Sequence, residues 1–284
     1  MPTIEALKKR LGIQVLFDFT DIIDAIEFAA ANDFGVVEIN LGNIRFGEQL
    51  RRAGARKKIR RCAERTGVIL AIHALEGPSF FIPSARVRRC AIAELKQTLD
   101  WAAEVGARNV IMHLGFDMHY GYGGGNRYTH EEFPEYYQEA LFSALAELKA
   151  YARQRARLCV ENVGGFRFVP SKKVLPKLLG TSLGLCFDIG HITILPEDKK
   201  EEEFNFFKRF SSAVYHAHLH HNNGVKDQHL PLGAGTVDFR PYLKFLLNTR
   251  ALLVFETRPK EAALASRDYF MNKLLPEGGF FQRR

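Results

Sequence analysis

The stretch Leu185-Cys186-Phe187-Asp188-Ile189-Gly190-His191 is a short apolar run that ends in an acid, with a histidine three residues later. Other apolar runs of strand length also end at or near a His, Asp or Glu. They lie at 158–162, 215–219 and 253–257, and earlier at Ile72-His73 and Met112-His113. In an eight-stranded parallel α/β barrel, the carboxyl ends of the strands open onto one mouth. Six strands that deliver such side chains to one mouth indicate a metal site rather than packing alone.

The rest of the chain alternates short apolar segments with amphipathic ones. Strands are expected at 13–19, 36–41, 68–75, 109–115, 157–163, 183–189, 214–220 and 251–257. Helices are expected at 21–33, 48–66, 84–105, 133–156, 171–179, 198–212, 238–248 and 260–274, with Asp21, Ser84 and Ser171 as N-caps. Eight such repeats predict an α/β fold, a (β/α)8 TIM barrel that forms a single domain over residues 1–284. A doubly wound sheet is disfavoured because no Gly-x-Gly-x-x-Gly follows the first strand.

Composition is that of an ordinary globular protein, with 284 residues and 46% hydrophobic content. No run of about 18 apolar residues occurs, so no membrane span or membrane partner is expected. The four cysteines have no CxxC spacing and predict reduced core thiols in a cytoplasmic protein. The net charge of +8 permits binding to nucleic acid, but the basic clusters fall on helices and favour a solvated outer face.

Two connections that follow strands are long, at 115–129 and 220–237, and both are expected to cover the barrel mouth. For the first, a lid and a disordered insertion are equally favoured. The turn at 232–236 could offer backbone N–H groups to an anion, but a plain turn is favoured.

Side-chain parity places three acids on the inward faces of their strands. Glu161, Asp188 and Glu256 each follow small or apolar residues on the same face. Buried carboxylates of this kind must be paired or bound to metal. Among the histidines, His216, His218 and His220 all face one way, and His218 lies nearest the expected strand end. His191 and the pair Asp227 and His229 can reach the same place, whereas His119, His130 and His221 are assigned to loops.

These segments resemble the xylose isomerase-like TIM barrel superfamily, which includes sugar and sugar phosphate isomerases and epimerases and the endonuclease IV type of abasic-site nuclease (AP endonuclease family 2). The resemblance lies in 72–74, 112–115, 161–165, 187–191, 218–222, 227–239 and 255–257. It implies that one metal is held by Glu161, Asp188, His218 and Glu256. It also implies that the additional ligands of a trinuclear nuclease site are His73, His113, His191, Asp227 and His229. His221 and Ala234 depart from the family pattern, where acids are common.

The resulting first hypothesis is a divalent-metal-dependent isomerase or epimerase of a small sugar or sugar phosphate. Glu161 and Glu256 would then be catalytic, as an acid/base pair as well as ligands. The alternative is an endonuclease IV-like phosphodiesterase that acts on abasic DNA, and a third hypothesis is a barrel that binds without turnover. Mixed nitrogen and oxygen ligands suit one to three ions of zinc, manganese, cobalt or iron(II). Nothing in the sequence indicates the oligomeric state.

Overall fold

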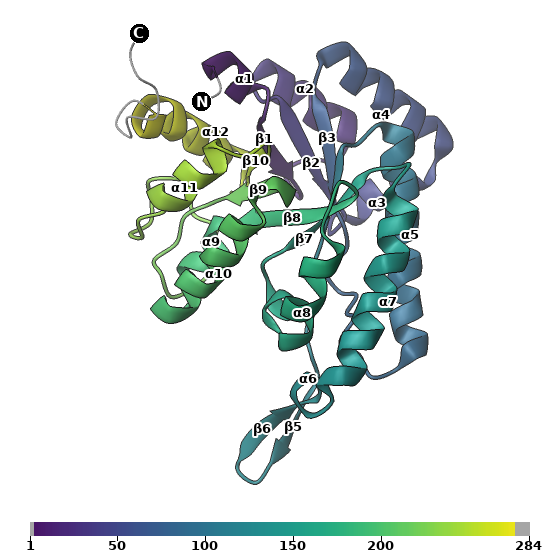
Figure 1. The fold of residues 1–284 in the computed structure, drawn as a ribbon. Coiled ribbons are helices and arrows are strands. Elements are labelled where there is room, and N and C mark those ends of the chain that lie inside the picture. Colours follow the sequence, from purple (N-terminus) through teal and green to yellow (C-terminus); the bar gives the residue numbers. More distant parts are fainter. Residues whose placement is uncertain (1–2, 276–284) are drawn as a thin grey trace.

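Eight parallel strands close into a barrel in the computed structural model, which describes residues 3–275 (Figure 1). The strands are β1 (Leu11–Val15), β2 (Val36–Asn40), β3 (Ile69–His73), β4 (Asn109–Met112), β7 (Arg157–Glu161), β8 (Leu183–Asp188), β9 (Val214–Leu219) and β10 (Leu252–Phe255). They pair in chain order, and β1 closes the ring by pairing with β10. The eight predicted strands are confirmed, and the fold is the predicted (β/α)8 barrel.

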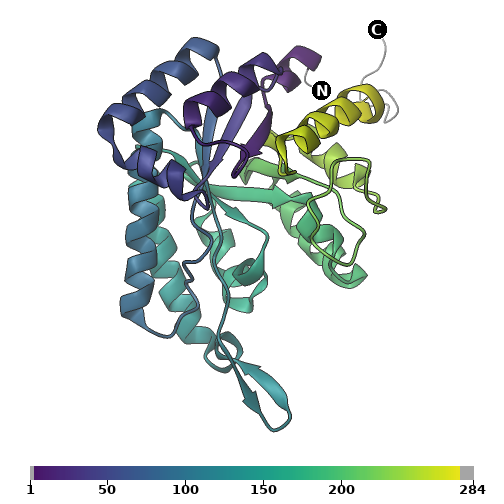
Figure 2. The same ribbon diagram turned by 180° about the vertical axis from the view of Figure 1, so that it is seen from behind.

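Helices surround the barrel on the outside (Figures 1 and 2). The longer ones are α2 (Ile22–Ala31), α3 (Ile44–Arg51), α4 (Ala53–Thr66), α5 (Ala85–Val105), α7 (Pro134–Ala152), α8 (Val169–Leu178), α10 (Glu197–Arg209), α11 (Arg240–Leu247) and α12 (Lys260–Tyr269). Shorter elements are α1 (Ile4–Lys8), α6 (Thr129–Glu132), α9 (Ile189–Thr193), the 3-10 turns η1 (Gly164–Arg167) and η2 (Ser211–Ala213), and the π-helical turn η3 (Phe270–Leu274). None of the helices in residues 3–275 is long and apolar enough to cross a membrane.

Local signals explain where several helices begin. The side chain of Asp21 accepts a hydrogen bond from the backbone N–H of Ile23, and Ser84 caps α5 in the same manner. The N-cap predicted at Ser171 is wrong, because α8 already begins at Val169 with a proline in its first turn. The hydroxyl of Ser171 instead donates to the backbone oxygen of Gly165 at 2.6 Å.

The main hydrophobic core fills the space between the strands and the helices, where rings such as Phe46, Phe81 and Phe187 are fully buried. The interior of the barrel holds much less apolar material. Its apolar residues form two small separate clusters, Ala71, Ile111, Cys159 and Cys186 in one and Val36, Leu252 and Val254 in the other. The described cysteines are all free, and Cys90 is exposed, so the expectation of a core thiol fails there. The remaining interior space is occupied by polar side chains.

The first long connection forms a β-hairpin, β5 (His119–Tyr122) paired with β6 (Gly125–Tyr128), which projects away from the barrel (Figures 1 and 2). Neither a lid nor a disordered insertion describes it. Asp117 closes its base, because its carboxylate accepts hydrogen bonds from the hydroxyl of Thr129 at 2.5 Å and the backbone N–H of His130 at 2.9 Å. The Nδ1 atom of His130 lies 2.6 Å from the same carboxylate. His130, assigned to a loop without a partner, is therefore a buried part of this closure.

Candidate metal centre

Each strand of the barrel contributes at least one polar side chain to the inward face, near or just beyond its carboxyl end. Inward positions alternate along each strand, and several of the more amino-terminal ones belong to the small apolar clusters inside the barrel. The polar members are Gln14, Glu38, His73, His113, Glu161, Asp188, His218 and Glu256. Because the strands are parallel, these side chains form one ring at the mouth.

A central group of ligand atoms comes from Glu161, Asp188, His218 and Glu256, and these atoms all lie within 4.8 Å of one another. The Nδ1 atom of His218 is 3.5 Å from oxygens of Glu161 and Asp188 and 3.1 Å from Oε2 of Glu256. The side chains come from β7, β8, β9 and the residue after β10. The structure therefore brings together the four residues predicted to hold one ion, and their role as ligands stays a prediction.

A second group adjoins the first through Glu161. The Oε2 atom of Glu161 lies 3.3 Å from Nε2 of His73 and 3.1 Å from Nε2 of His113. The other carboxylate oxygen, Oε1, lies 3.1 Å from Nδ1 of His191. Glu161 is thus surrounded by imidazoles and is shared between neighbouring groups.

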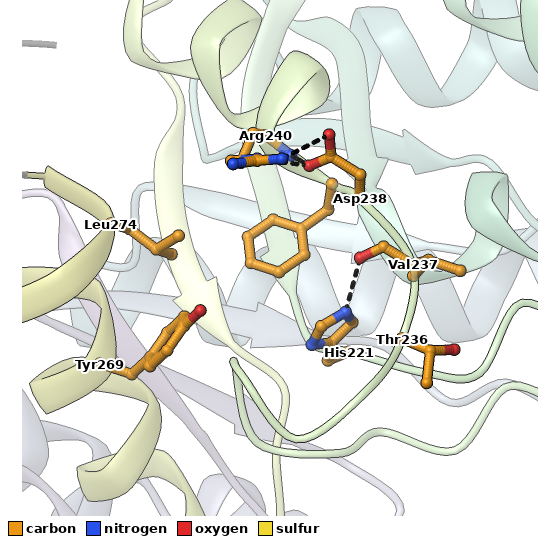
Figure 3. Close-up of a pocket in the computed structure, with 8 residues that line it drawn as sticks. His221, Thr236, Val237, Asp238, Arg240, Tyr269 and Leu274 are labelled. Atoms are coloured by element: carbon orange, nitrogen blue, oxygen red, sulfur yellow. Dashed lines mark hydrogen bonds and ion pairs between the residues drawn. The ribbon is translucent and has the colours of Figure 1, made fainter. Parts of the chain in front are cut away.

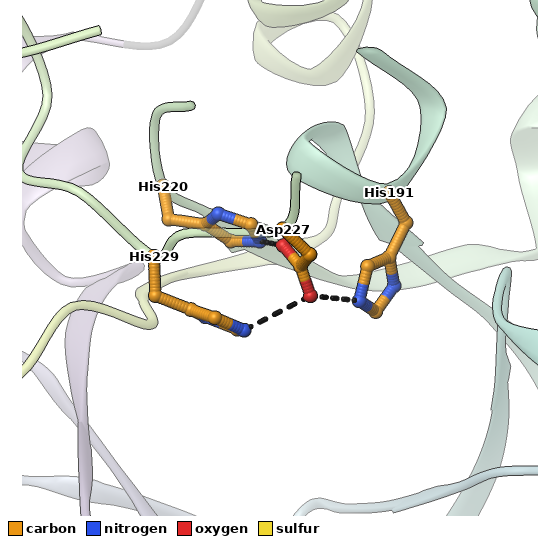
Figure 4. Close-up of side chains that lie close together, drawn as sticks. All are labelled: His191, His220, Asp227 and His229. Carbon is orange, nitrogen blue, oxygen red and sulfur yellow. Dashed lines mark hydrogen bonds and ion pairs between the residues drawn. The ribbon is translucent and has the colours of Figure 1, made fainter. Parts of the chain in front are cut away.

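A third group surrounds the carboxylate of Asp227 (Figure 4). The Nε2 atoms of His191 and His229 lie 3.0 and 3.1 Å from Oδ2 of Asp227. A residue outside the predicted set, His220, also belongs to this group, with Nε2 3.6 Å from Oδ1 of Asp227. The predicted residues of the second and third groups all lie beside the central group.

The carboxylates of the centre are held ionised. Burial alone would raise the pKa of Glu161, but the positive charge of His218 and its neighbours holds it well below its usual range. Burial would also raise the pKa of Asp188, but the charges of His191 and His220 and the hydrogen bonds of His218 and His220 together lower it. For Glu256, burial is opposed chiefly by His218, and the pKa falls to about 2.

Two imidazoles show the complementary effect. Burial would lower the pKa of His73, but the hydrogen bond and the charge of Glu161 raise it to about 9. Burial would likewise lower the pKa of His229, but the hydrogen bond of Asp227 and the charges of Glu256 and Asp227 raise it to about 9. Protons on these imidazoles therefore neutralise the carboxylates, and a divalent cation would replace those protons.

The donor set fits divalent metal ions. Oε2 of Glu256 is buried and accepts no hydrogen bond, so its lone pairs face the centre. His73 donates from Nδ1 to the backbone oxygen of Ala74, and His229 donates from Nδ1 to the backbone oxygen of Glu256. Each of these bonds fixes the tautomer that leaves Nε2 directed at the carboxylates, as is usual for metal-binding histidines.

A family model described as the xylose isomerase-like TIM barrel matches residues 26–273. The chain belongs to the xylose isomerase-like TIM barrel family.

Sequence relatives include two uncharacterized proteins of Methanocaldococcus jannaschii. One is 27% identical over 171 residues, which are 57% of this chain and 54% of the relative. The other is 24% identical over 183 residues, which are 62% of this chain and 64% of the relative. The chain thus spans less than two thirds of the length of these relatives.

Three solved structures are similar to this chain in fold. A D-tagatose 3-epimerase-like protein has a TM-score of 0.76 and 20% identity, over 94% of this chain and 98% of that chain. A protein of Thermus thermophilus soaked with zinc chloride has a TM-score of 0.66 and 24% identity, over 90% and 95%. Endonuclease IV of the same organism has a TM-score of 0.64 and 20% identity, over 94% and 99%. At these identities the likeness shows the fold alone.

Within this xylose isomerase-like barrel, the sequence interpretation missed the residues that support His218. Nε2 of His218 lies 3.2 Å from both oxygens of Glu38, which leaves Nδ1 directed at the central group. Glu38 also accepts a hydrogen bond from Gln14 at 2.8 Å and lies 2.6 Å from Nε2 of His216. Two features of the sequence could have identified these residues. Glu38 is an acid inside an apolar strand, and His216 shares the inward face with His218.

Glu256 has supporting residues of its own that were also missed. Its Oε1 atom accepts hydrogen bonds from Gln14 and Arg258, each at 2.9 Å. Behind the third group, Arg167 donates to the backbone oxygen of His191 at 3.0 Å and pairs with the buried Glu203 at 2.8 Å. No pattern in the sequence distinguishes these residues from surface ion pairs.

His221 departs from the family pattern, and the structure gives it a structural role. Nδ1 accepts hydrogen bonds from the backbone N–H groups of Gly233 and Gly235 at 3.2 and 3.0 Å. Nε2 donates to the backbone oxygen of Val237 at 2.8 Å, as Figure 3 shows at the edge of a pocket also lined by Tyr269. Burial lowers the pKa of His221, which suits this neutral donor and acceptor role. The turn at 232–236 is therefore organised by an imidazole, and it is not arranged as an anion cradle.

Proposed function

We propose that this protein is a metal-dependent phosphodiesterase of the endonuclease IV type, acting on nucleic acid at an abasic site. The observation that carries the proposal is the position of Glu161, which contacts imidazoles with both carboxylate oxygens and joins neighbouring ligand groups. A carboxylate shared between ligand groups is suited to a centre with more than one ion. Adjacent ions are used to stabilise both the attacking and the leaving oxygen in phosphoryl transfer.

The surroundings of the two glutamates are unfavourable for the isomerase mechanism. A base that removes a proton from a substrate carbon must have a free oxygen within reach of that proton. Glu161 is only 1% exposed and its oxygens face histidines. Glu256 holds Gln14 and Arg258 with one oxygen and faces His218 with the other. Both are better placed to hold cations than to exchange carbon-bound protons.

Bound divalent ions would supply Lewis-acid activation of a phosphoryl oxygen and of water. The chain itself supplies the fixed carboxylates and exposed side chains that can position the substrate. Large apolar side chains stand exposed in the connections that follow the first four strands, at Phe17, Leu75 and Phe116 and at Ile44, the first residue of α3. Phe17 and Ile44 are 75% and 78% exposed. The aromatic rings of Phe17 and Phe116 suit stacking with unstacked bases, which a small sugar would not provide.

A second candidate function is the isomerase or epimerase of a small sugar or sugar phosphate. It is favoured by the central group of Glu161, Asp188, His218 and Glu256, which is complete for one ion without the other histidines. In this reaction the second group would be dispensable. Zinc, manganese and cobalt all suit the ligands of either candidate.

The deciding experiment uses His113→Asn, which removes a ligand of the second group alone. The protein loaded with zinc, manganese or cobalt is assayed on an abasic oligonucleotide and for solvent-deuterium incorporation and product formation with a panel of ketoses and ketose phosphates. The phosphodiesterase proposal predicts that the rate of oligonucleotide cleavage falls by more than about 100-fold in the variant. This is a larger loss than the roughly 10–100-fold usually caused by removing a residue that only orients a metal ligand. His119→Asn, on the exposed hairpin, is the matched control and keeps full activity. Sugar turnover that persists in His113→Asn, without oligonucleotide cleavage by the wild type, assigns the isomerase function.

A further inference from the structure

The third ligand group contains one histidine more than the family resemblance implies, and this residue changes what the group can do. We infer that His220 completes a closed four-ligand metal site with His191, Asp227 and His229, and that this site fastens the loop between β9 and α11. The group is called the loop site below. The inference rests on the proposed function in one respect, which is that the reaction is assigned to the central group and the second group.

Three separate segments converge on the loop site. His191 comes from α9, His220 follows β9 directly, and Asp227 and His229 lie within the loop. Figure 4 shows the three imidazole rings around the carboxylate of Asp227, and each ring presents its Nε2 atom to it. The rings of His220 and His229 are stacked, with centroids 4.1 Å apart.

The backbone is adapted to hold these rings. A Cβ atom at Gly190 would lie 1.8 Å from Cε1 of His220, so only glycine leaves room for the ring in this position. His229 has a φ of 49°, in the left-handed region that costs about 1–3 kcal/mol for a residue other than glycine. This conformation is kept where it directs the imidazole of His229 at Asp227.

Ligand number separates two kinds of zinc site. Catalytic sites have three protein ligands and keep a position open for water or substrate, whereas structural sites have four and are closed. With His191, Asp227 and His229 alone, the loop site would be open. The Nε2 atom of His220 supplies the fourth ligand, so a tetrahedral ion there has no position left for substrate.

The part of the loop that carries Asp227 and His229 needs such a fastening because it has little apolar packing of its own, and none of residues 223–230 is buried. Val225 is 74% exposed, and a backbone bridge between His221 and Leu230 joins the two ends of this part of the loop. An ion that binds only the folded loop shifts the equilibrium between folded and open loop by a factor of one plus the ratio of the ion concentration to its dissociation constant. Holding Asp227 and His229 in this way also keeps the backbone oxygen of Glu256 bonded to His229.

The test follows the loop rather than the reaction. Lys226 is exposed within the loop, and trypsin cleavage after it reports how often the loop opens. At an ion concentration 100 times the dissociation constant, we expect zinc to slow this cleavage about 100-fold, with a chelator reversing the protection. His220→Asn should lose one ion per chain by elemental analysis and lose the protection.

Gly190→Ala serves as a second variant, because it displaces the ring of His220 without removing a ligand. It should lose the same ion, and the cobalt-substituted form should lose its four-coordinate absorption in both variants. His119→Asn is the matched control, and circular dichroism checks that each variant is folded.

Unchanged metal content in His220→Asn, or zinc-independent cleavage after Lys226 in the wild type, overturns the inference. Loss of the central ion instead of the loop ion also overturns it. Nε2 of His220 lies 3.0 Å from Oδ1 of Asp188, so this outcome would mean that His220 only orients that carboxylate. A wild type that protects Lys226 with zinc but cleaves no oligonucleotide refutes the proposed function and supports the loop site.

Discussion

Glu38 offers a direct test of how the centre is organised, because both of its carboxylate oxygens lie within hydrogen-bond distance of the predicted ligand His218. Its two oxygens lie 3.2 Å from Nε2 of His218, and it also accepts a hydrogen bond from Gln14. In Glu38→Gln the charge is lost and one oxygen becomes an NH2 group. That group faces donors from His218 and Gln14, so at least one hydrogen bond must be given up.

The expected effect follows from these contacts. A hydrogen bond to a charged group contributes about 1.5–3 kcal/mol, and losing the partner of a metal-binding histidine weakens metal affinity about 10–100-fold. We therefore expect the ion of the central group to bind about 10–100-fold more weakly in Glu38→Gln. The loop site should be unaffected, because Glu38 contacts none of its ligands.

Competition with a chelator of known affinity measures the change for each ion. Glu64→Gln is the matched control, because Glu64 forms only an exposed ion pair with Arg60 and such pairs contribute about 0–1 kcal/mol to stability. Equal affinities of wild type and Glu38→Gln for the central ion would refute the reasoning, since His218 would then not depend on Glu38.

Three further outcomes are expected. Because the pKa values of His73 and His229 are about 9, both imidazoles are protonated at pH 7. Metal binding should therefore release protons, and the metal affinity should increase as the pH rises toward about 9. Calorimetric binding heats that are the same in buffers of different ionisation enthalpy would contradict this. His221→Ala leaves two partly buried turn amides without an acceptor, and the loss of these two hydrogen bonds should lower the free energy of unfolding by about 1–3 kcal/mol, seen as a lower urea midpoint. Glu203→Ala should lower the free energy of unfolding by less than the roughly 3–5 kcal/mol expected for breaking a fully buried ion pair, because Arg167 is 28% exposed and regains some hydration. An unchanged melting temperature would argue against a stabilising role for this ion pair.

The barrel could be predicted because its signal is repeated eight times and does not depend on any one element. The ends of the strands were less accurate: β4 ends at Met112, whereas the apolar pattern continues to Gly115. Ladder hydrogen bonds stop where the chain turns into the mouth, and hydrophobicity does not mark that point. The short α9 was missed because five residues contain too little of a helical period to be recognised.

The candidate site was predictable to the extent that it is built from strand ends. Asp188 and His218 converge because parallel strands carry them to one rim, which parity and position can reveal. Glu38 could not be separated from an ordinary buried ion pair, and His220 could not be chosen among three alternating histidines. Their roles depend on which neighbour each nitrogen or oxygen faces, and this is set by the closure of the whole barrel.

The closure at the base of the hairpin has a practical consequence. Asp117 binds Thr129 and His130 outside the β5–β6 ladder, so the entry and exit of the arm are held together without help from its tip. Exposed tips on such closed bases are the sites where inserted sequence is best tolerated. The turn at Gly123 is thus a natural place to insert an affinity tag or a reporter domain, well separated from the chemistry of the barrel mouth.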